Sequence, residues 1–492
     1  MPWSAFTVIV PLFAALLSVP LGRHAARLAP AAALLGLAAA MGAVAQVWQH
    51  GAIDHAVGGW LPPLGIRLHL DGLAASFLIM SAVVATAVTG YAGPRFGAPG
   101  TRETRVGFAF WPLLFFLWAA LNAVLIGGDL FNLYVALELL SLTAVALVAL
   151  DGKPAMLAAA MRYLLFALFG SLAYLLGAVL LYVNYGTLDL QQLRNVAIAD
   201  NATLLAGALM TAGLMAKTAL LPLHAWLPPA HAGAPAPASA LLSALVVKGS
   251  FYIIVRLWFD VLPTVASAQL TVLLGTLGAA AILFGSILAL RQQRLKLIVA
   301  YSTIAQLGYL FLIFPLAGGA GEIQPWSASA WTGGIYHALA HAPAKAAMFL
   351  AAGVLVQAVG HDRLEGLHGI ARALPITAFA FALAAVSLMG LPPSGGFTAK
   401  YLLLTAALAG HFWVWALVMI AGGLLAAGYL FRVLNRFLLE GDSTQTLQPV
   451  PWRGQIIALL LAMLSIAMGL MSAGPYALLQ IGRPSAAATG LS

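Results

Sequence analysis

Long uninterrupted stretches of apolar residues dominate this sequence, and they restrict the possible fold more than any other feature. Of the 492 residues, 62% are hydrophobic and only 8% are charged, whereas soluble domains carry about 25% charged residues. A stretch of about 20 apolar residues is long enough to cross a bilayer as a helix. The sequence therefore excludes soluble, disordered and fibrous proteins, and it predicts an all-α integral membrane protein.

The apolar stretches number about fourteen, and no soluble domain fits between them. The first has no small-residue cleavage site, so we interpret it as a retained helix rather than a signal peptide. The stretches at 329–358 and 373–406 are long enough for each to contain a break. The expected helices cover approximately 3–22, 28–48, 71–92, 107–127, 130–150, 160–184, 203–222, 236–259, 267–290, 296–316, 329–358, 373–406, 411–438 and 454–474.

The basic residues are distributed unevenly between the two sides of this expected bundle. Short cytoplasmic loops collect lysine and arginine, and this bias accounts for the net charge of +9 better than nucleic-acid binding does. It predicts a multi-pass protein of a bacterial-type inner (plasma) membrane with both termini non-cytoplasmic. The richer side carries Arg23, Arg27, Arg95, Arg102, Arg105, Lys153, Arg162, Arg291, Arg294, Lys296, Arg363, Arg372, Arg432, Arg436 and Arg453, and the other carries Arg67, Arg194, Arg256 and Arg483.

Five charged residues lie in the middle of membrane spans, flanked by apolar residues: Glu138, Lys217, Lys248, Lys345 and Lys400. A charge at the bilayer centre costs about 2.5–3.5 kcal/mol on insertion scales, and such residues usually have a function. Salt bridges that only hold helices together are an alternative, but one acid cannot pair with four lysines. Since burial disfavours the charged form, and neighbouring charges influence each other's protonation, the pattern predicts a proton relay.

Histidines form a second group of titratable residues. His337, His341 and Lys345 are four residues apart, so they share one helix face, and Pro343 lies among them. His224 and His231 lie in a proline-rich connection between two helices. With no cysteine present, we expect neither a metal site nor a cofactor, and we expect the histidines to handle protons.

Two of the expected helices contain prolines that should interrupt them. Pro222 follows Lys217, and the pair Pro392–Pro393 precedes Lys400. Interrupted helices at membrane depth are typical of ion-binding sites in transporters. Ordinary kinks are the alternative. A lysine near each interruption favours an ion path.

Four motifs in order give the sequence a resemblance to a known family. They are DLFNLYVALELLSL, KTALLPLHAWLPPAHAGAPAPASALLSALVVKGSFY, HALAHAPAKAAMFLAAG and GLPPSGGFTAKYLL. The sequence resembles the antiporter-like membrane subunits shared by respiratory complex I, membrane-bound hydrogenases and Mrp-type cation/proton antiporters. In length it is most similar to the D-type component of Mrp antiporters. It departs from the family at LPPSGGF, where LPPLSGF or LPPFSGF is usual, and at Pro343, where a bulky apolar residue is usual.

The resemblance implies a fold of fourteen helices with two inverted five-helix repeats, in which helices 7 and 12 are discontinuous. It also implies roles for the buried charges. Glu138 and Lys217 would form a coupled pair, Lys248 and Lys345 would continue a central polar axis, and Lys400 would end it near the exit. The histidines at 224, 231, 337 and 341 match family motifs. The implied regions are 1–106 (three helices), 107–260 (first repeat, helices 4–8), 261–440 (second repeat, helices 9–13) and 441–492 (helix 14 and tail).

Three functions remain open at this point, and none has catalysis by the chain alone. The first is a proton-translocating subunit of a multisubunit Na⁺ or K⁺/proton antiporter. The second is the proton-pumping subunit of a NADH:quinone oxidoreductase-like enzyme or a membrane-bound hydrogenase, whose redox centres would lie on partner subunits. The third is an energy-coupling subunit for inorganic carbon uptake. All three predict other hydrophobic subunits as partners in the lipid bilayer.

Overall fold

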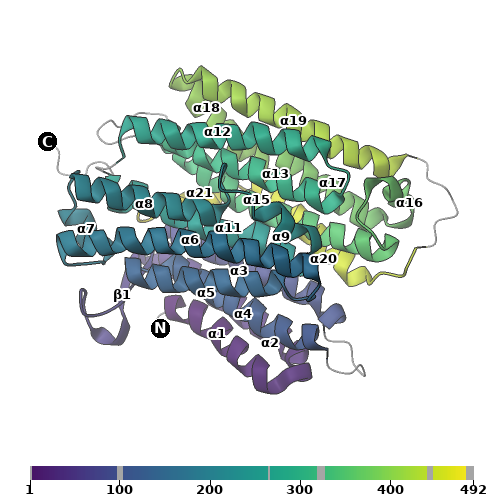
Figure 1. The fold of residues 1–492 in the computed structure, drawn as a ribbon, viewed down its shortest axis with the longest axis horizontal. Coiled ribbons are helices and arrows are strands. Elements are labelled where there is room, and N and C mark those ends of the chain that lie inside the picture. Colours follow the sequence, from purple (N-terminus) through teal and green to yellow (C-terminus); the bar gives the residue numbers. More distant parts are fainter. Residues whose placement is uncertain (1–2, 97–103, 264–265, 319–326, 440–446, 484–492) are drawn as a thin grey trace.

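The structure is a computed structural model, and it describes residues 3–96, 104–263, 266–318, 327–439 and 447–483. Arg102, assigned above to the basic side, lies outside the described residues. Within them the chain is a bundle of helices that run in nearly the same direction (Figure 1). Helices α1 and α2 lie at one edge of the view and α18 and α19 at the other, while α20 and α21 return to the middle of the bundle.

The first half of the chain contains a helical hairpin, a β-hairpin and a series of long helices. Its elements are α1 (Trp3–Leu21), η1 (Gly22–His24), α2 (Ala25–His50), β1 (Ile53–Ala56), η2 (Val57–Gly59), β2 (Arg67–Leu70), α3 (Gly72–Phe96), α4 (Arg105–Ile126), α5 (Leu130–Val148), α6 (Pro154–Tyr185), α7 (Leu190–Val196), α8 (Asn201–Thr218), α9 (Leu227–Gly233), α10 (Ala236–Leu241), η3 (Leu242–Val246), α11 (Val247–Val255) and η4 (Arg256–Val261).

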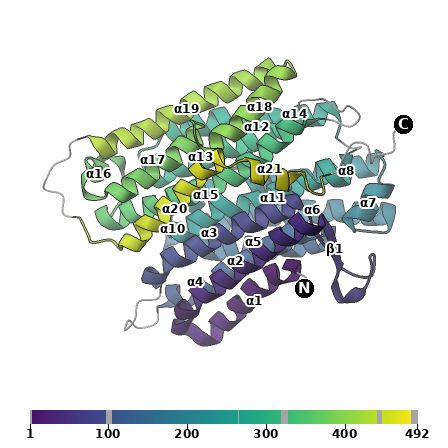
Figure 2. The same cartoon turned by 180° about the vertical axis from the view of Figure 1, so that it is seen from behind.

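Among the described residues of the second half, all the elements of regular secondary structure are helices. Its elements are α12 (Ala268–Arg291), α13 (Leu295–Phe311), α14 (Ile313–Ala317), α15 (Ser327–Val359), η6 (Leu364–Leu367), α16 (Ile370–Ala373), α17 (Pro375–Met389), α18 (Gly395–Ala409), α19 (Trp413–Leu438), α20 (Trp452–Leu470) and α21 (Ala473–Gln480). Seen from behind, α20 and α21 lie across the bundle (Figure 2), where both contact α3 and α15.

The number of membrane crossings agrees with the sequence prediction. Eleven described segments are long and apolar enough to cross a membrane. One of them, Trp3–His50, contains two helices, α1 and α2, joined by a turn. The interrupted pairs α8–α9 and α17–α18 each supply one further crossing. The described chain therefore contains about fourteen crossings and is an all-α membrane protein.

The two expected interruptions are present. Helix α8 ends at Thr218, and the chain does not become helical again until Leu227; Pro222 lies in between. Helix α17 ends at Met389 and α18 begins at Gly395, with Pro392 and Pro393 between them. The other long stretch, which was also expected to have room for a break, is one continuous helix, α15, despite Pro343.

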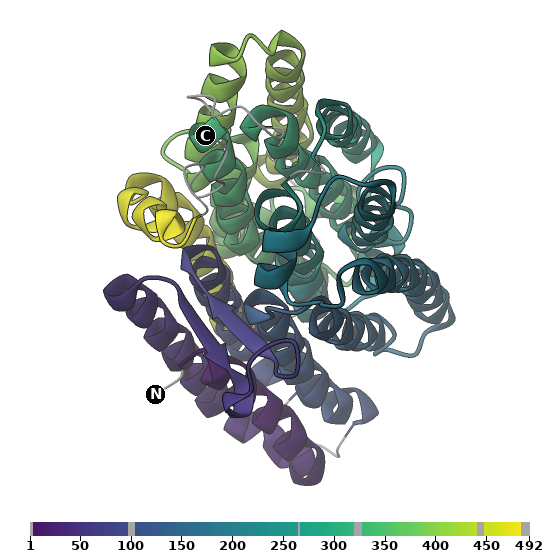
Figure 3. The same cartoon turned by 90° about the vertical axis from the view of Figure 1, so that its left-hand side faces the viewer.

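One short β-hairpin departs from the otherwise all-α fold. Strands β1 and β2 form an antiparallel hairpin, in which Asp54 lies opposite His69. The residues of β2, RLHL, alternate between polar and apolar, as a strand with two different faces requires. The hairpin was missed because it is short and lies between two apolar stretches. It lies at one end of the bundle, beside the N-terminal helices (Figure 3), and we call this end the hairpin end.

The opposite end gathers basic loops, and we call it the basic end. There the loop before α13 pairs with the loop after α15 through Arg294 and Arg363, and Arg294 also binds Asp362 at 3.0 Å. Gln448 N donates to Ala358 O, which brings the segment before α20 to the same place. Arg294 and Arg363, two of the basic residues predicted to share one side, therefore lie together in the structure.

Candidate functional site

Glu138 and Lys217 are in contact, as the resemblance implied. Glu138 lies on α5 and Lys217 near the end of α8, and Lys217 Nζ lies 3.2 Å from Glu138 Oε1. The ammonium also donates to Ser141 Oγ at 2.7 Å, one turn further along α5. Lys217 is 4% exposed and Glu138 is 20% exposed. The acid is thus the more accessible partner of the pair.

The interruption after α8 places Lys217 at a helix end. Ala219 adopts a left-handed conformation (φ 59°), which turns the chain out of the helix. Trp226 Nε1 donates to Ala216 O at 2.9 Å, a carbonyl group at the helix end that also accepts from Ala219 N at 3.3 Å. Trp226 also stacks on Tyr163 of α6, with ring centroids 4.0 Å apart. Trp226 thus anchors the end of the break in protein, while Pro222 and Ala225 within the break are exposed.

Lys248 is fully buried and depends on a local widening of its helix. The segment η3 is a π-helical turn, and Lys248 lies directly after it. Lys248 Nζ donates to the main-chain oxygen of Ser243 at 2.7 Å. Since π-turns shift the backbone bonding pattern and recur at functional sites, the widened turn explains why a carbonyl group is available to this lysine.

Lys345 is held by α13. Its ammonium donates to Val299 O at 2.9 Å and to the hydroxyl of Ser302. Ser302, in a polar stretch of α13 between Tyr301 and Tyr309, therefore faces a buried lysine. Lys345 lies on α15, so this contact joins two neighbouring helices.

Hydrogen bonds connect the Lys248 and Lys345 sites through side chains of α13. Ser243 Oγ and Thr303 Oγ1 are 2.9 Å apart. Thr303 Oγ1 also donates to Val299 O at 3.0 Å, and this is the carbonyl oxygen that Lys345 binds. The two lysine sites are thus linked through Ser243, whose carbonyl group binds Lys248 and whose hydroxyl group contacts Thr303.

Lys400 lies beside the second interruption. Its ammonium donates to Leu388 O at 2.7 Å, in the last turn of α17. Gln306 of α13 donates to the same carbonyl oxygen at 3.2 Å. Lys400 Nζ also lies 4.4 Å from the centre of the Tyr309 ring, a cation–π contact. Helix α13 therefore reaches Lys400 as well.

The histidines are distributed unevenly. His337 and His341 lie one turn apart on α15 with ring centroids 5.8 Å apart, and His337 is 5.5 Å from the Tyr309 ring. His231 stacks on Phe349 of α15. The ring nitrogens of these three histidines are buried and have no hydrogen-bond partner among the described residues. They face the lysine sites, where water would supply the missing contacts.

His224 does not join this set. It lies in the loop between α8 and α9, half-buried, and its ring packs edge-on against Phe284 of α12 at 5.1 Å. No contact with a buried lysine or with Glu138 is found for it in the part of the chain that the structure describes. His224 and His231 occur in the same sequence motif, so the sequence did not indicate this difference. It arises because His224 lies in the loop after the helix break, whereas His231 lies in α9.

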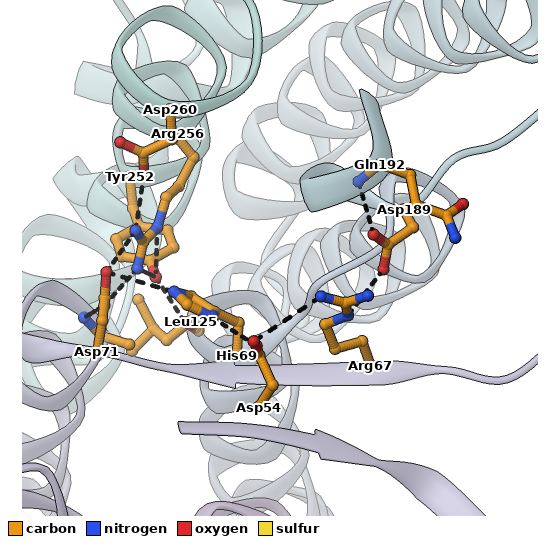
Figure 4. Close-up of polar contacts among 11 residues, drawn as sticks. Asp54, Arg67, His69, Asp71, Leu125, Asp189, Gln192, Tyr252, Arg256 and Asp260 are labelled. Carbon is orange, nitrogen blue, oxygen red and sulfur yellow. Dashed lines mark hydrogen bonds and ion pairs between the residues drawn. The ribbon is translucent and has the colours of Figure 1, made fainter. Parts of the chain in front are cut away.

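A second polar network, which the sequence did not predict, lies at the hairpin end (Figure 4). Arg256 binds Asp71 with two hydrogen bonds, at 2.5 and 2.7 Å, and Asp260 at 2.7 Å. It also donates to Tyr252 Oη at 3.0 Å. His69 of the hairpin lies between two carboxylates, 2.8 Å from Asp54 and 3.6 Å from Asp71.

Asp71 caps the start of α3 by accepting from Ala74 N at 2.9 Å. Its larger role is the ion pair with Arg256. Burial by itself would raise the pKa of Asp71, but the Arg256 guanidinium holds that pKa well below its usual range. Burial likewise lowers the pKa of His69, and the hydrogen bonds with Asp54 and Asp71 outweigh this effect and raise it to about 9. The network therefore keeps His69 charged at neutral pH. Asp129 caps α5 in a similar way, by accepting from Phe131 N and Asn132 N.

The fold and the buried lysines together define a multi-pass membrane protein with titratable groups inside its bundle. Residues 127–426, more than half of the chain, match the family described as NADH:quinone oxidoreductase/Mrp antiporter, transmembrane. The chain belongs to this family.

Relatives come from both branches of the family. The chain is 38% identical to the N component of NADH-quinone oxidoreductase from Desulforudis audaxviator, over 90% of this chain and 88% of that protein. It is 30% identical to the D component of a Na⁺/H⁺ antiporter from Alkalihalophilus pseudofirmus, over 80% of this chain and 76% of that protein. Among solved structures, a chain of the Mrp complex from Dietzia sp. DQ12-45-1b is similar, with a TM-score of 0.86, 26% identity, and coverage of 97% of this chain and 96% of that chain.

Proposed function

We propose that this chain is the proton-translocating subunit of a multisubunit membrane complex, and that the complex is a monovalent cation/proton antiporter of Mrp type. The observation that carries the proposal is the hydrogen-bonded connection between the sites of Lys248 and Lys345. A set of buried lysines that share polar contacts can change protonation in a coupled way. A scaffold that only held other subunits would have no need of buried charges, which are costly.

The relay runs from one helix interruption to the other. Protons enter the pair Glu138–Lys217, pass along Lys248 and Lys345 with His231, His337 and His341 beside them, and leave near Lys400. His224 takes no part in transfer along the axis. The proton is the ion carried by this chain, because Glu138 is the one carboxylate among the described relay residues and sodium prefers a cluster of oxygen ligands. The exchanged Na⁺ or K⁺ would pass through a partner or an interface between subunits.

The second candidate is the proton-pumping subunit of a complex I-like NADH:quinone oxidoreductase. It is favoured by the higher identity to the N component of that enzyme than to the D component of the antiporter. The relay would be the same in both cases, and only the source of energy would differ. Antiporter subunits co-purified with the tagged chain would support the first candidate, and subunits that carry iron–sulfur clusters would support the second.

The relay itself is tested by transport. The tagged complex in inverted membrane vesicles should couple proton movement to Na⁺, K⁺ or a redox substrate, and Lys217→Ala and Glu138→Gln should each abolish that coupling. Assembly of the complex around each variant is checked by the recovery of partner subunits. Normal proton coupling in both assembled variants would refute the relay.

We place the basic end in the cytoplasm of the cell and both termini on the other side, in the inner membrane, because short cytoplasmic loops are rich in lysine and arginine. A charged label that reacts with cysteine from one side only would test this orientation, since the chain has no cysteine of its own.

A further inference from the structure

A cavity of about 510 Å³ opens at the basic end of the bundle. Its wall is formed by loops that are far apart in the sequence: the end of α3 with Arg95, the turn with Asp151 and Lys153, the loop between α9 and α10, and the segments near Gln357 and Gln448. A cavity of this size and polarity has room for several water molecules. Water from this side can therefore enter the bundle.

Lys296 lies in the wall of this cavity and is only 8% exposed. Its ammonium donates to Ala234 O at 2.9 Å. Among the described residues, no carboxylate lies within ion-pair distance of it: Asp362 pairs with Arg294 instead, and Asp151 lines the same cavity without pairing. Two of its three N–H donors are thus free for water. The sequence had assigned Lys296 only to the positive side of the topology.

Helix α13 connects Lys296 to the relay. Lys296 is in its first turn, and Val299, whose carbonyl oxygen binds Lys345, follows three residues later. Three residues of α-helix rise about 4.5 Å, so the position of Lys296 and the contact of Lys345 lie on successive turns of α13. Ser302, Thr303, Gln306 and Tyr309 continue these contacts toward Lys248 and Lys400. One helix therefore carries contacts from the cavity to the far end of the relay.

The loop that Lys296 binds is itself close to the relay. Ala234 follows α9, which carries His231, and His231 stacks on Phe349, four residues after Lys345 on α15. Lys296 thus belongs to the helix that Lys345 contacts, α13, and its side chain binds the segment that follows His231. A change in the charge of Lys296 acts on both.

We propose that this cavity is a water-filled proton inlet, and that Lys296 exchanges protons between it and Lys345. The neutral amine of Lys296 takes up one proton through the water of the cavity. The resulting ammonium then gives one proton to the amine of Lys345, which leaves Lys296 neutral again, so that no other reactant is needed. This inference rests on the proposed relay and adds a branch that joins it in the middle, away from the Glu138–Lys217 pair. A competing role for Lys296 is purely structural, as a cation that fixes the loop at Ala234.

Two substitutions separate these roles in vesicles that contain the assembled complex. Lys296→Arg keeps the charge and a donor for Ala234 O, but guanidinium does not release its proton at physiological pH. Lys296→Gln removes the charge. We expect both to lower the initial rate of proton translocation at least tenfold, while Arg291→Gln, an exposed basic-end residue outside the cavity, keeps the normal rate. Normal translocation in Lys296→Arg would mean that the lysine is structural and would overturn the inference.

The access of water is tested separately with single cysteines, since the chain has none. Gln357→Cys places a thiol in the cavity wall, and Arg291→Cys places one outside it. A charged thiosulfonate reagent added from the basic end should block translocation in the first and spare it in the second. Labelled Gln357→Cys that still translocates at the normal rate would refute the inlet.

Lys217→Ala, measured in the same vesicles, distinguishes failure of the inlet from failure of the relay. If Lys217→Ala abolishes translocation and both Lys296 variants are normal, the inlet is wrong and the relay stands. If Lys217→Ala is normal, the relay is wrong and the inlet falls with it.

Discussion

Ser243 and Thr303 share a hydrogen bond of 2.9 Å between side chains that are 60 residues apart in the sequence. Ser243 also provides the carbonyl oxygen for Lys248, and Thr303 donates to the carbonyl oxygen that holds Lys345. These two hydroxyl groups are therefore the link between the lysine sites of neighbouring helices. Their removal should uncouple the sites without removing either lysine.

We expect Thr303→Val to slow proton translocation about tenfold. The valine has nearly the same shape, but it leaves Ser243 Oγ without its partner in a buried place, where a lost hydrogen bond costs about 1–3 kcal/mol. The rate is measured in vesicles with equal amounts of assembled complex. Thr276→Val is the control, because Thr276 is exposed and its hydroxyl bonds only within its own helix. Equal rates in the two variants would contradict the proposed link.

Ser141→Ala should impair the first pair in the relay. The change removes the acceptor that lies 2.7 Å from Lys217 Nζ and leaves Glu138 as the remaining contact of the ammonium. We expect a several-fold lower translocation rate. Ser171→Ala is a matched control, since this buried hydroxyl has no hydrogen-bond partner among the described residues. A normal rate for Ser141→Ala would mean that Glu138 alone positions Lys217.

Two glycines should respond in opposite directions to the same substitution. A Cβ atom on Gly213 would overlap the main-chain oxygen of Gly170, where α8 and α6 touch, whereas a Cβ on Gly93 of α3 meets nothing within 4 Å. Gly213→Ala should therefore lower the melting temperature of the purified protein and displace the helix that carries Lys217. Gly93→Ala should leave it unchanged or raise it, since alanine favours the helix by up to about 1 kcal/mol. A neutral Gly213→Ala would show that the two helices can move apart freely.

The hairpin end should depend on pH through His69. Its pKa is raised from 6.5 to about 9 in the folded protein, so its contribution to stability is fully present below pH 6.5 and is lost as the pH rises through 9. Between pH 6.5 and 9.5 the melting temperature should fall in the native protein and fall less in His69→Gln. His55→Gln, on the opposite face of the hairpin, should retain the native slope. The same slope in His69→Gln would mean that other groups control this dependence.

Arg256→Met should destabilise the fold strongly, because it leaves Asp71 buried without its cation. Breaking a buried ion pair from one side costs about 3–5 kcal/mol. Adding Asp71→Asn should recover a large part of the loss, and the four melting temperatures of the double-mutant cycle measure the coupling. Arg194→Met is the control, on a partly exposed arginine of α7. Additive losses in the double variant would show that the pair contributes no coupling energy.

The helices and their interruptions could be predicted from the sequence, because the length of an apolar stretch and the position of proline act locally. The Glu138–Lys217 contact could be anticipated through the family motifs. The hairpin-end network could not, since Asp71 and Arg256 are 185 residues apart and only the packing of α3 against the neighbouring helices brings them together. In hindsight, the alternation in RLHL and the four-residue spacing of Arg256 and Asp260 were the available signals.

The partners of the buried lysines were also beyond the sequence. The sequence indicated that Lys248, Lys345 and Lys400 lie inside the membrane, where a carboxylate is the usual partner of a buried ammonium group. Instead, each one binds a main-chain oxygen, which depends on the exact course of a helix: a π-turn for Lys248 and a broken end for Lys400. The sequence did not indicate a role for Lys296 in proton transfer, because its position near a basic loop was already explained by the charge bias of the membrane topology.

Main-chain anchoring has a consequence for how such a protein can change over time. Lys248, Lys345 and Lys400 are fixed by the carbonyl groups of Ser243, Val299 and Leu388, and every amino acid supplies that group. The identity of the anchoring residue can drift while the anchor persists, provided that the helix keeps its path. Only Lys217, among these four lysines, relies on a carboxylate side chain, so a single substitution at Glu138 removes its counter-charge, and we expect variation to be tolerated least at that end of the line.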